Sequence, residues 1–343
     1  MRIAIDAMGG DHAPAAIVEG AVLAARDFQV GIDLVGDEAQ VREALVGFDV
    51  TGLDIQVVHA EQVVAMDESP SSAVRRKRKS SIWYANQRVA DGHCQAVISA
   101  GNTGACMGTS LFVLKPVAGV ERPAIAALLP TLTGTSIMLD VGANVDSKPH
   151  HLVQFAYMGH EYAKRVSKLP APRVGILSIG EEESKGSPLT KEAAQRLKQS
   201  PLNFIGNVEG RDIFNGNADV IVCDGFIGNV ALKASEGLAE AIMQMLRREI
   251  EASVLGGLGY TLLKPAFKRF KARVDYSEYG GAPLLGLSGI SIICHGRSDP
   301  WAIRNAVRLA KRMHDEKIAT HISSDIRADS AASAGTATIE EGQ

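Results

Sequence analysis

Two segments of the chain combine the features of an anion-binding turn: a strand end, glycines, an asparagine and the start of a helix. Residues 99–105 have the sequence Ser-Ala-Gly-Asn-Thr-Gly-Ala, and residues 223–230 have the sequence Cys-Asp-Gly-Phe-Ile-Gly-Asn-Val. Backbone N–H groups at a helix N-terminus attract anions, and a nearby hydroxyl or amide adds a donor. We therefore expect the two segments to face one phosphate-like anion, lined by Gly101, Asn102, Thr103, Gly104, Asp224, Gly225, Gly228 and Asn229. The first segment could instead be a structural tight turn between strand and helix, with Thr103 as the helix N-cap and no bound anion.

The loop at residues 6–14 has a related composition. Gly9 and Gly10 allow backbone N–H groups to turn toward an anion, and Asp11 and His12 follow them directly. We interpret these four residues as lining the same site. A structural tight turn is the alternative, with Asp11 as a helix cap and His12 in a structural role.

Two more loops supply charged and amide groups. Residues 140–144 follow a predicted strand and contain Asp140 and Asn144. Asp140 would either orient a partner group or cap a helix. Residues 178–186 place Lys185 between glycines, where it could neutralise an anion, although charged runs more often form a solvated surface.

Metal and cofactor motifs are missing from the sequence. HxxH and HExxH spacings are absent, and His150 and His151 are adjacent on a predicted helix, so we expect them to point in different directions. The four cysteines form no CxxC pair and are expected to be buried thiols. The GxGxxG spacing of nicotinamide and flavin sites is also absent. The sequence therefore predicts no metal site and no cofactor.

Apolar runs that suit strands alternate with amphipathic stretches that suit helices. Strands are predicted at residues 3–7, 32–36, 55–59, 96–100, 124–130, 136–141, 174–179, 203–206, 220–223 and 291–294. Helices are predicted at residues 14–26, 38–45, 82–91, 149–167 and 188–198. This alternation predicts an α/β fold with a mainly parallel sheet, helices on both faces and a hairpin between the fifth and sixth strands. Ligands bind such sheets where strands end in loops, which is where the candidate residues lie.

Length and composition are those of a globular enzyme. The 343 residues can form a single α/β domain over residues 1–321, either undivided or in two lobes. Residues 322–343 are rich in Ala, Ser and Thr, so we expect a flexible tail. The net charge of −3 argues against a nucleic-acid partner. The first residues are too polar for a signal peptide, and no apolar run approaches the roughly 20 residues of a membrane span, so we expect a cytoplasmic protein.

An α/β core does not explain residues 234–274. Helical periodicity on both sides of the glycines at 256–259 predicts a protruding αα-hairpin. Its tip combines apolar and cationic residues: Leu255, Leu258, Leu262, Leu263, Lys264, Lys268, Arg269, Lys271 and Arg273. We expect this tip either to enter the headgroup region of a membrane or to form a dimer contact. A second basic group, which begins with Arg75, Arg76 and Lys77, could meet an acidic protein, phosphate or an anionic membrane.

The string IAIDAMGGDHAP at the start of the chain resembles the N-terminal signature of the bacterial phosphate acyltransferases of phospholipid synthesis, the PlsX family. The resemblance continues in order through residues 74–77, 99–105, 140–144, 180–186 and 224–233, and it covers about residues 1–318. It implies transfer of an acyl group from acyl carrier protein to inorganic phosphate, and a fold similar to phosphotransacetylases and isocitrate-type dehydrogenases. It also implies a homodimer, peripherally bound to an anionic membrane, that passes acyl phosphate to a membrane glycerol-3-phosphate acyltransferase.

The candidate residues suit that chemistry. Phosphate is already charged at neutral pH, and no Ser-His-Asp or Cys-His arrangement is visible, so we expect direct attack without an acyl-enzyme. Asn102 and Thr103 would then hold phosphate, Lys185 would neutralise phosphate or the oxyanion, and Asn229 would donate to the carbonyl oxygen. Two other functions stay open: a nicotinamide-dependent decarboxylating dehydrogenase of similar fold, and a non-catalytic membrane scaffold for lipid enzymes.

Overall fold

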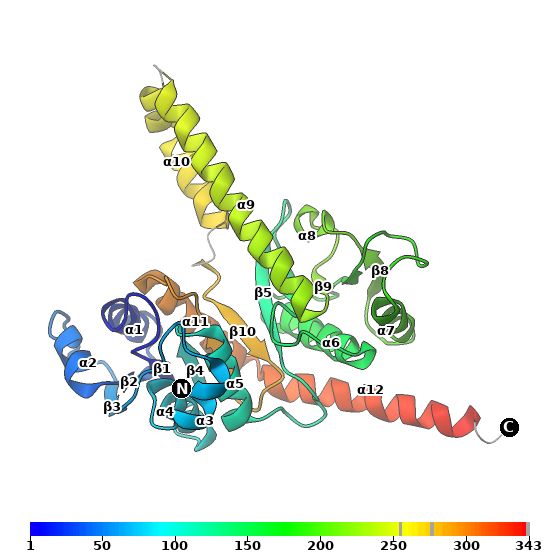
Figure 1. Cartoon of the computed structure of the whole chain (residues 1–343), viewed down its shortest axis with the longest axis horizontal. Helices are drawn as coiled ribbons and strands as arrows, with labels where there is room; N and C mark the ends of the chain where they lie inside the picture. Colours follow the sequence, from blue (N-terminus) through cyan, green and yellow to red (C-terminus); the bar gives the residue numbers. More distant parts are fainter. Residues whose placement is uncertain (254–255, 275–277, 341–343) are drawn as a thin grey trace.

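The computed structural model describes residues 1–253, 256–274 and 278–340, and in this part of the chain it forms one 11-stranded sheet (Figure 1). The strands are β1 (Arg2–Asp6), β2 (Gly31–Gly36), β3 (Ile55–His59), β4 (Ala96–Ser99), β5 (Ala124–Pro130), β6 (Thr135–Leu139), β7 (Val174–Leu177), β8 (Phe204–Val208), β9 (Val220–Val222), β10 (Ala282–Leu285) and β11 (Ile290–Ile293). Their spatial order is β3-β2-β1-β4-β11-β10-β5-β6-β9-β7-β8. All except β10 were predicted. This strand contains Pro283, which lacks the N–H that a strand interior uses.

The sheet consists of two parallel blocks that run in opposite directions. Strands β3, β2, β1, β4 and β11 form one parallel block, and β6, β9, β7 and β8 form the other. Between them, β10 pairs antiparallel with β11 and with β5, and β5 pairs antiparallel with β6 as the predicted hairpin. Because three antiparallel pairings separate the blocks, their strands end at opposite edges of the sheet. The mainly parallel sheet is confirmed, but its loops form two groups.

Helices cover both faces, as predicted. They are α1 (Ala15–Phe28), α2 (Glu38–Leu45), α3 (Pro70–Arg76), α4 (Ser81–Ala90), α5 (Thr103–Leu114), α6 (Pro149–Arg165), α7 (Pro188–Lys198), α8 (Asp212–Asn215), α9 (Gly225–Ala252), α10 (Gly256–Val274), α11 (Pro300–Asp315) and α12 (Ile318–Glu340). Alternate residues of β1 show the two layers. Ile3 and Ile5 pack in the core that contains α1, α6 and α11, whereas Ala4 packs in the core that contains α4 and α5.

The structure differs from the predicted flexible tail, because residues 318–340 form helix α12. The segment from Ile322 was expected to contribute nothing to the core, yet Ile318, Ile322 and Ile326 are buried in it. Their spacing of four residues places all three on one face of the helix. The hydroxyl of Tyr157 on α6 also donates to Asp329 Oδ1 at 2.7 Å. The domain therefore extends beyond residue 321.

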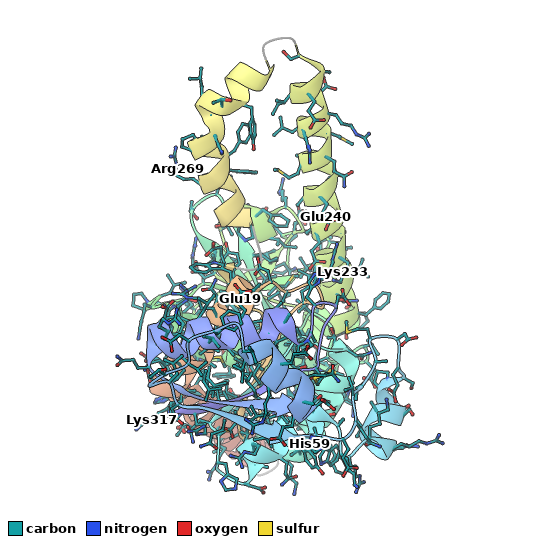
Figure 2. The ribbon with its side chains drawn as sticks, turned by 90° about the vertical axis from the view of Figure 1, so that its left-hand side faces the viewer. Glu19, His59, Lys233, Glu240, Arg269 and Lys317 are labelled. Atoms are coloured by element: carbon teal, nitrogen blue, oxygen red, sulfur yellow. The ribbon has the colours of Figure 1, made fainter. Side chains whose placement is uncertain are left out.

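Helices α9 and α10 form the predicted hairpin, which stands away from the body of the molecule (Figure 2). Helix α9 begins at Gly225 rather than at residue 234, so it extends from the sheet edge to the hairpin tip. The glycines at 256–259, which the sequence predicted to separate the two helices, lie in the first turn of α10. No helix in the described ranges is both long and apolar enough to cross a membrane.

Candidate active site

The loops after β1 and β4 pack directly on each other. A Cβ on Gly9 would lie 2.8 Å from the backbone nitrogen of Gly101, so a side chain is excluded there. Ser99 Oγ donates to Asp6 Oδ2 at 2.7 Å and accepts the N–H of Gly101 at 3.1 Å. Burial raises the pKa of Asp6, while hydrogen bonds from Ser81 and Ser99 oppose that shift. Asp6 and Ser99 therefore fix the predicted glycine loops in one arrangement.

Helix α5 offers backbone donors at its N-terminus. Asn102, rather than Thr103, is its cap, and Asn102 Oδ1 accepts the N–H of Ala105 at 2.9 Å. The side-chain amide of Asn102 also donates to the carbonyls of Met66 at 2.7 Å and Glu68 at 3.1 Å. Thr103 is exposed at the first helical position, where its N–H lacks a partner within the helix. An anion here would contact backbone N–H groups and the Thr103 hydroxyl, since the Asn102 side chain is already engaged.

A third loop at this edge was not recognised in the sequence. The loop after β11 contains His295, Gly296 and Arg297, and the carbonyl of Gly296 accepts the N–H of Asp11 at 2.8 Å. Burial lowers the pKa of His295, and the nearby cations Lys233 and Arg297 lower it further. The predicted strand ended at Cys294, so the strand-end rule used for the other loops would have identified these residues. We call residues 6–14, 99–105 and 294–299 the first loop cluster.

The loop after β6 is organised by a buried carboxylate. Asp140 accepts hydrogen bonds from the backbone N–H groups of Ile125, Gly142, Ala143 and Asn144, at distances from 2.7 to 3.2 Å. The Asn144 side chain donates to Asp140 Oδ2 at 2.9 Å. Burial raises the pKa of Asp140, and these hydrogen bonds oppose the shift. Both predicted site residues thus shape the loop, and Asp140 caps no helix.

The N-terminus of α9 packs against that loop. Asp224 caps α9 by accepting the N–H of Phe226 at 2.9 Å, and its other oxygen accepts the N–H of Ser147 at 3.1 Å. A Cβ on Gly228 would lie 1.9 Å from the carbonyl oxygen of Asp140, so only glycine fits there. Asn229 is exposed in the next position, with its side chain near Gly142. We call residues 140–148 and 223–230 the second loop cluster.

Helix α9 connects the two clusters. It begins in the second cluster, and Lys233 and Glu236 on its next turns act electrostatically on His295 of the first. Further along, Glu240 Oε1 lies 3.6 Å from Arg297 Nη2. Figure 2 shows Lys233 near the body of the molecule and Glu240 higher on the hairpin. The residues of α9 that interact with the first cluster thus lie about two to four helical turns from the start of the helix in the second cluster, despite the opposite direction of the two strand blocks.

Lys185 lies in a different environment. Its backbone N–H donates to the carbonyl of Glu182 at 2.9 Å, its stem lies beside Gly180, and its side chain is exposed. Among the described residues, no hydrogen bond or ion pair joins Lys185 to either loop cluster. Its catalytic role is still a prediction.

The residues of the basic group that begins at Arg75 lie in two different environments. Lys77 forms an ion pair with Glu68 at 2.5 Å and donates to the carbonyl of Val63 at 2.7 Å, so it holds the preceding segment in place. Arg75 and Arg76 are exposed at the end of α3. This helix lies against α5, because a Cβ on Gly104 would meet Pro70 at 2.5 Å. The two arginines are thus carried by a helix that borders the first loop cluster.

The hairpin carries part of the predicted contact set on its surface. Leu262, Leu263, Lys264 and Arg269 are exposed on α10. Leu255 lies outside the described residues, as do the side chains of Leu258, Lys268, Lys271 and Arg273.

His150 and His151 do not point apart, contrary to the prediction. Their Nε2 atoms lie 3.0 and 3.3 Å from the same oxygen of Glu121. A cation would have three ligands of suitable type here. However, His151 Nδ1 accepts the N–H of Lys148 at 3.0 Å, so the neutral ring carries its proton on Nε2 and donates it to Glu121. This geometry favours a hydrogen-bonded anchor for the start of α6.

A family model and solved structures of other proteins match this chain over most of its length. Residues 1–321 match the family described as "Fatty acid synthesis protein". A phosphotransacetylase from Streptococcus pyogenes has a TM-score of 0.61 at 16% identity, covering 92% of this chain and 94% of that one. A branched-chain phosphotransacylase from Enterococcus faecalis has a TM-score of 0.57 at 14% identity, covering 90% and 98%. The expected similarity to phosphotransacetylases is confirmed.

Sequence relatives are closer. A phosphate acyltransferase of Citrifermentans bemidjiense is 57% identical over 310 residues, which are 90% of this chain and 88% of the relative. A phosphate acyltransferase of Pelotomaculum thermopropionicum is 51% identical over 341 residues, or 99% of both chains. Identity of this extent leaves the dehydrogenase and scaffold alternatives without support. The chain belongs to the phosphate acyltransferase family and is an acyltransferase of that family.

Proposed function

We propose that the chain transfers a fatty acyl group from the thioester of acyl carrier protein to inorganic phosphate, and that the acyl phosphate feeds phospholipid synthesis. The observation that carries this proposal is identity of 51–57% to phosphate acyltransferases over most of the chain. The geometry supports it, because the first loop cluster presents backbone donors at the start of α5 and the cation Arg297 after β11, and Lys233 of α9, which is paired with Glu236 at 2.8 Å, lies near His295 of this cluster.

The chemistry requires little beyond positioning. A phosphate oxygen attacks the thioester carbonyl, the new O–C bond forms, and the C–S bond then breaks so that the carrier thiolate leaves and takes up a proton. Holding the two reactants together can supply about 7 kcal/mol or more of the barrier, and one oxyanion donor about 3 kcal/mol. The chain must therefore bind two anions close together and stabilise a third on the carbonyl oxygen.

Named groups can take these roles. The N–H groups of Thr103 and Gly104, with the Thr103 hydroxyl, would hold phosphate at the start of α5. Asn229 would donate to the carbonyl oxygen from the start of α9. Lys233 borders His295 and would add positive charge between the clusters, and Lys185 would neutralise phosphate or the oxyanion from its exposed loop.

We further propose a homodimer that binds anionic membranes peripherally and passes its product to a membrane glycerol-3-phosphate acyltransferase. Leu238, Ile242 and Met245 are exposed at helical spacing on α9, an arrangement that suits a second copy of the hairpin. Leu262 and Leu263 on α10 are exposed beside the cations Lys264 and Arg269, an arrangement that suits a headgroup boundary.

A substrate comparison tests the activity. Purified chain is mixed with palmitoyl-acyl carrier protein and phosphate, and acyl phosphate is trapped with hydroxylamine while free carrier thiol is counted. We expect equal amounts of both products, in proportion to added phosphate, and slower reaction with palmitoyl-coenzyme A. Thiol release that does not require phosphate would identify a thioesterase instead. Equal rates with coenzyme A would remove the carrier protein from the proposal.

A further inference from the structure

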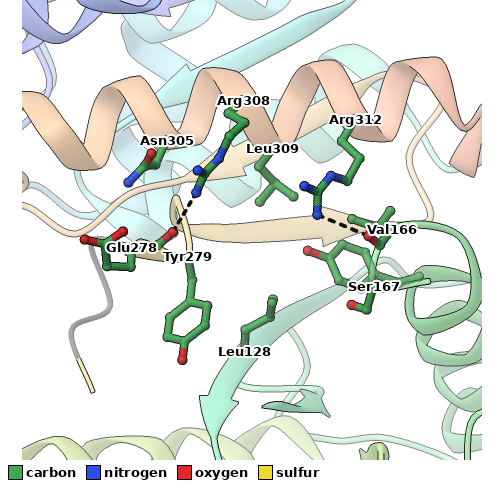
Figure 3. A pocket seen from close by; sticks show the side chains of 10 residues that line it. Leu128, Val166, Ser167, Glu278, Tyr279, Asn305, Arg308, Leu309 and Arg312 are labelled. Atoms are coloured by element: carbon green, nitrogen blue, oxygen red, sulfur yellow. Dashed lines mark hydrogen bonds between the residues drawn. The ribbon is translucent and has the colours of Figure 1, made fainter. Parts of the chain in front are cut away.

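A cavity of about 120 Å³ lies away from both loop clusters. It is bounded by β5, the end of α6, α11 and residues 278–279, which lead into β10. Figure 3 shows Arg308 and Arg312 pointing from α11 into this space, with Leu128 on the opposite side and Tyr279 beside it. The proposed acyl transfer uses none of these residues.

The cavity has positive charge that no described carboxylate pairs with. Arg308 donates to the carbonyl of Glu278 at 3.0 Å, and Arg312 donates to the carbonyl of Val166 at 3.2 Å. Both acceptors are neutral, and within the described residues neither arginine forms an ion pair. On the same helix, Lys311 is paired with Asp315 at 2.8 Å. The charges of Arg308 and Arg312, which face the cavity, are thus not balanced by an ion pair among the described residues, whereas the charge of Lys311 is.

The pKa of Arg308 reflects this environment. Burial lowers it, and the neighbouring cations Arg304 and Arg312 lower it further, while Glu278 opposes the shift. Glu278 is itself engaged, because its Oε1 accepts the indole N–H of Trp301 at 3.1 Å. An anion in the cavity would relieve the repulsion between the arginines.

Tyr162 supplies a second, independent observation. The side chain is fully buried and lines the cavity, and its hydroxyl has no hydrogen-bond partner among the described residues. Arg312 is close enough to act electrostatically on this hydroxyl. A buried hydroxyl without a partner costs stability, so an anion bound near Arg312 that accepts a hydrogen bond from Tyr162 would remove this cost.

We propose that this cavity binds a small oxyanion, with the guanidinium groups of Arg308 and Arg312 and the hydroxyl of Tyr162 as donors. Guanidinium groups match the paired oxygens of carboxylates and phosphates. The volume of about 120 Å³ suits inorganic phosphate or a short-chain carboxylate. Leu128 and Val166 line the cavity and provide an apolar surface for a short hydrocarbon group.

The indole of Trp301 can report binding, because it is hydrogen-bonded to Glu278 in the cavity wall. The chain has two tryptophans, so Trp83→Phe leaves Trp301 as the single emitter. In this background, inorganic phosphate and butyrate are titrated separately while Trp301 fluorescence is recorded. We expect a saturable change in Trp301 fluorescence with at least one of the two anions. The anion that binds more tightly shows whether the cavity prefers a phosphate or a carboxylate. Thr103→Val should leave the response unchanged, which separates this cavity from the first loop cluster.

Three variants test the donors. Arg308→Gln, Arg312→Gln and Tyr162→Phe should each weaken binding about tenfold, the loss of one hydrogen bond to a charged group. Lys311→Gln, which removes the same charge from the same helix outside the cavity, should bind normally. Tyr162→Phe should melt no lower than the parent chain without ligand, which controls for misfolding. An unchanged response in all three variants, or no response to either anion, would overturn the proposal.

Discussion

The side-chain amide of Asn102 donates to the backbone carbonyl of Met66 at 2.7 Å while its oxygen caps α5 through the N–H of Ala105. One side chain therefore fixes the start of α5 and the segment that precedes α3. These hydrogen bonds occupy the side-chain amide and oxygen of Asn102, which were predicted from the sequence to hold phosphate. What is left for an anion at this helix is the N–H of Thr103, the N–H of Gly104 and the Thr103 hydroxyl.

The first prediction separates these two roles. Thr103→Val removes one hydroxyl at nearly constant volume, so it should raise the KM for phosphate more than the KM for the acyl donor, with little change in melting temperature. Asn102→Ala should instead destabilise the fold by about 1–2 kcal/mol through the lost cap. Steady-state kinetics and thermal unfolding of both variants check this. Thr103→Ser is the control and should keep the phosphate KM, whereas equal KM changes for both substrates in Thr103→Val would contradict the assignment.

The second prediction concerns the two proposed catalytic residues. Asn229→Ala and Lys185→Ala should each lower turnover about hundredfold, the scale of one lost transition-state donor, with an unchanged melting temperature. Asn217→Ala and Lys191→Ala are matched controls at other loop and helix positions and should keep full turnover. Because Lys185 is exposed and joined to neither loop cluster, a normal rate in Lys185→Ala would assign its loop to the surface. Lys233→Gln would then be the next cation to measure.

The third prediction compares two glycines on α9. A Cβ at Gly228 would lie 1.9 Å from the carbonyl oxygen of Asp140, whereas nothing lies within 4 Å of a Cβ at Gly237. Gly228→Ala should therefore cost about 1–3 kcal/mol or more and displace the start of α9. Gly237→Ala should stabilise the chain by up to about 1 kcal/mol through helix propensity. Denaturant unfolding checks both values, and a neutral Gly228→Ala would show that the second loop cluster is loosely packed.

The strand ends could be predicted from the sequence because apolar runs and glycine turns mark them locally. The relation between the loops could not. The strand direction reverses between the two blocks because β10 pairs antiparallel with β11 and β5, which are far from each other in the chain, and β5 pairs antiparallel with β6. Strand β10 was not predicted because it contains Pro283. As a result, loops that share the pattern of strand, glycine and asparagine lie in two clusters, and α9 extends from one toward the other.

Two other differences have local causes. The three buried isoleucines of α12, Ile318, Ile322 and Ile326, are separated by small and polar residues, so the apolar pattern is too sparse to predict burial, yet α6 provides a surface for them. His150 and His151 are adjacent on a helix and should diverge by about 100°. They converge because both Nε2 atoms lie within hydrogen-bond distance of one carboxylate oxygen of Glu121, which precedes β5.

The fourth prediction is a pH dependence of stability. Burial lowers the pKa of His160 in the folded chain, and Lys164 and Arg165 lower it further against the opposing effect of Glu161. The unfolded chain has an ordinary histidine pKa of about 6.5, so it binds more protons than the folded chain just below that pH. The free energy of unfolding should therefore fall as the pH drops from 7.5 toward 5.5. His160→Gln should reduce this fall, as measured by urea unfolding at several pH values. An identical slope in variant and parent would show that His160 protonates freely in the fold.

The last prediction concerns the hairpin surface. Leu262 and Leu263 are exposed by 74% and 54% on α10, and Leu132 is exposed by 84% between β5 and β6 on the body of the molecule. If the tip of α10 enters a headgroup boundary, Leu262→Glu with Leu263→Glu should abolish sedimentation with anionic liposomes, since two apolar anchors become anions beside the lipid. Leu132→Glu changes a leucine elsewhere that is more exposed than either, and this variant should sediment normally. Both variants should keep the dimer, measured by ultracentrifugation, and the activity with soluble substrates. A double variant that becomes monomeric and inactive would instead assign these leucines to the contact between two copies, and Ile242→Glu on the neighbouring α9 should then give the same loss.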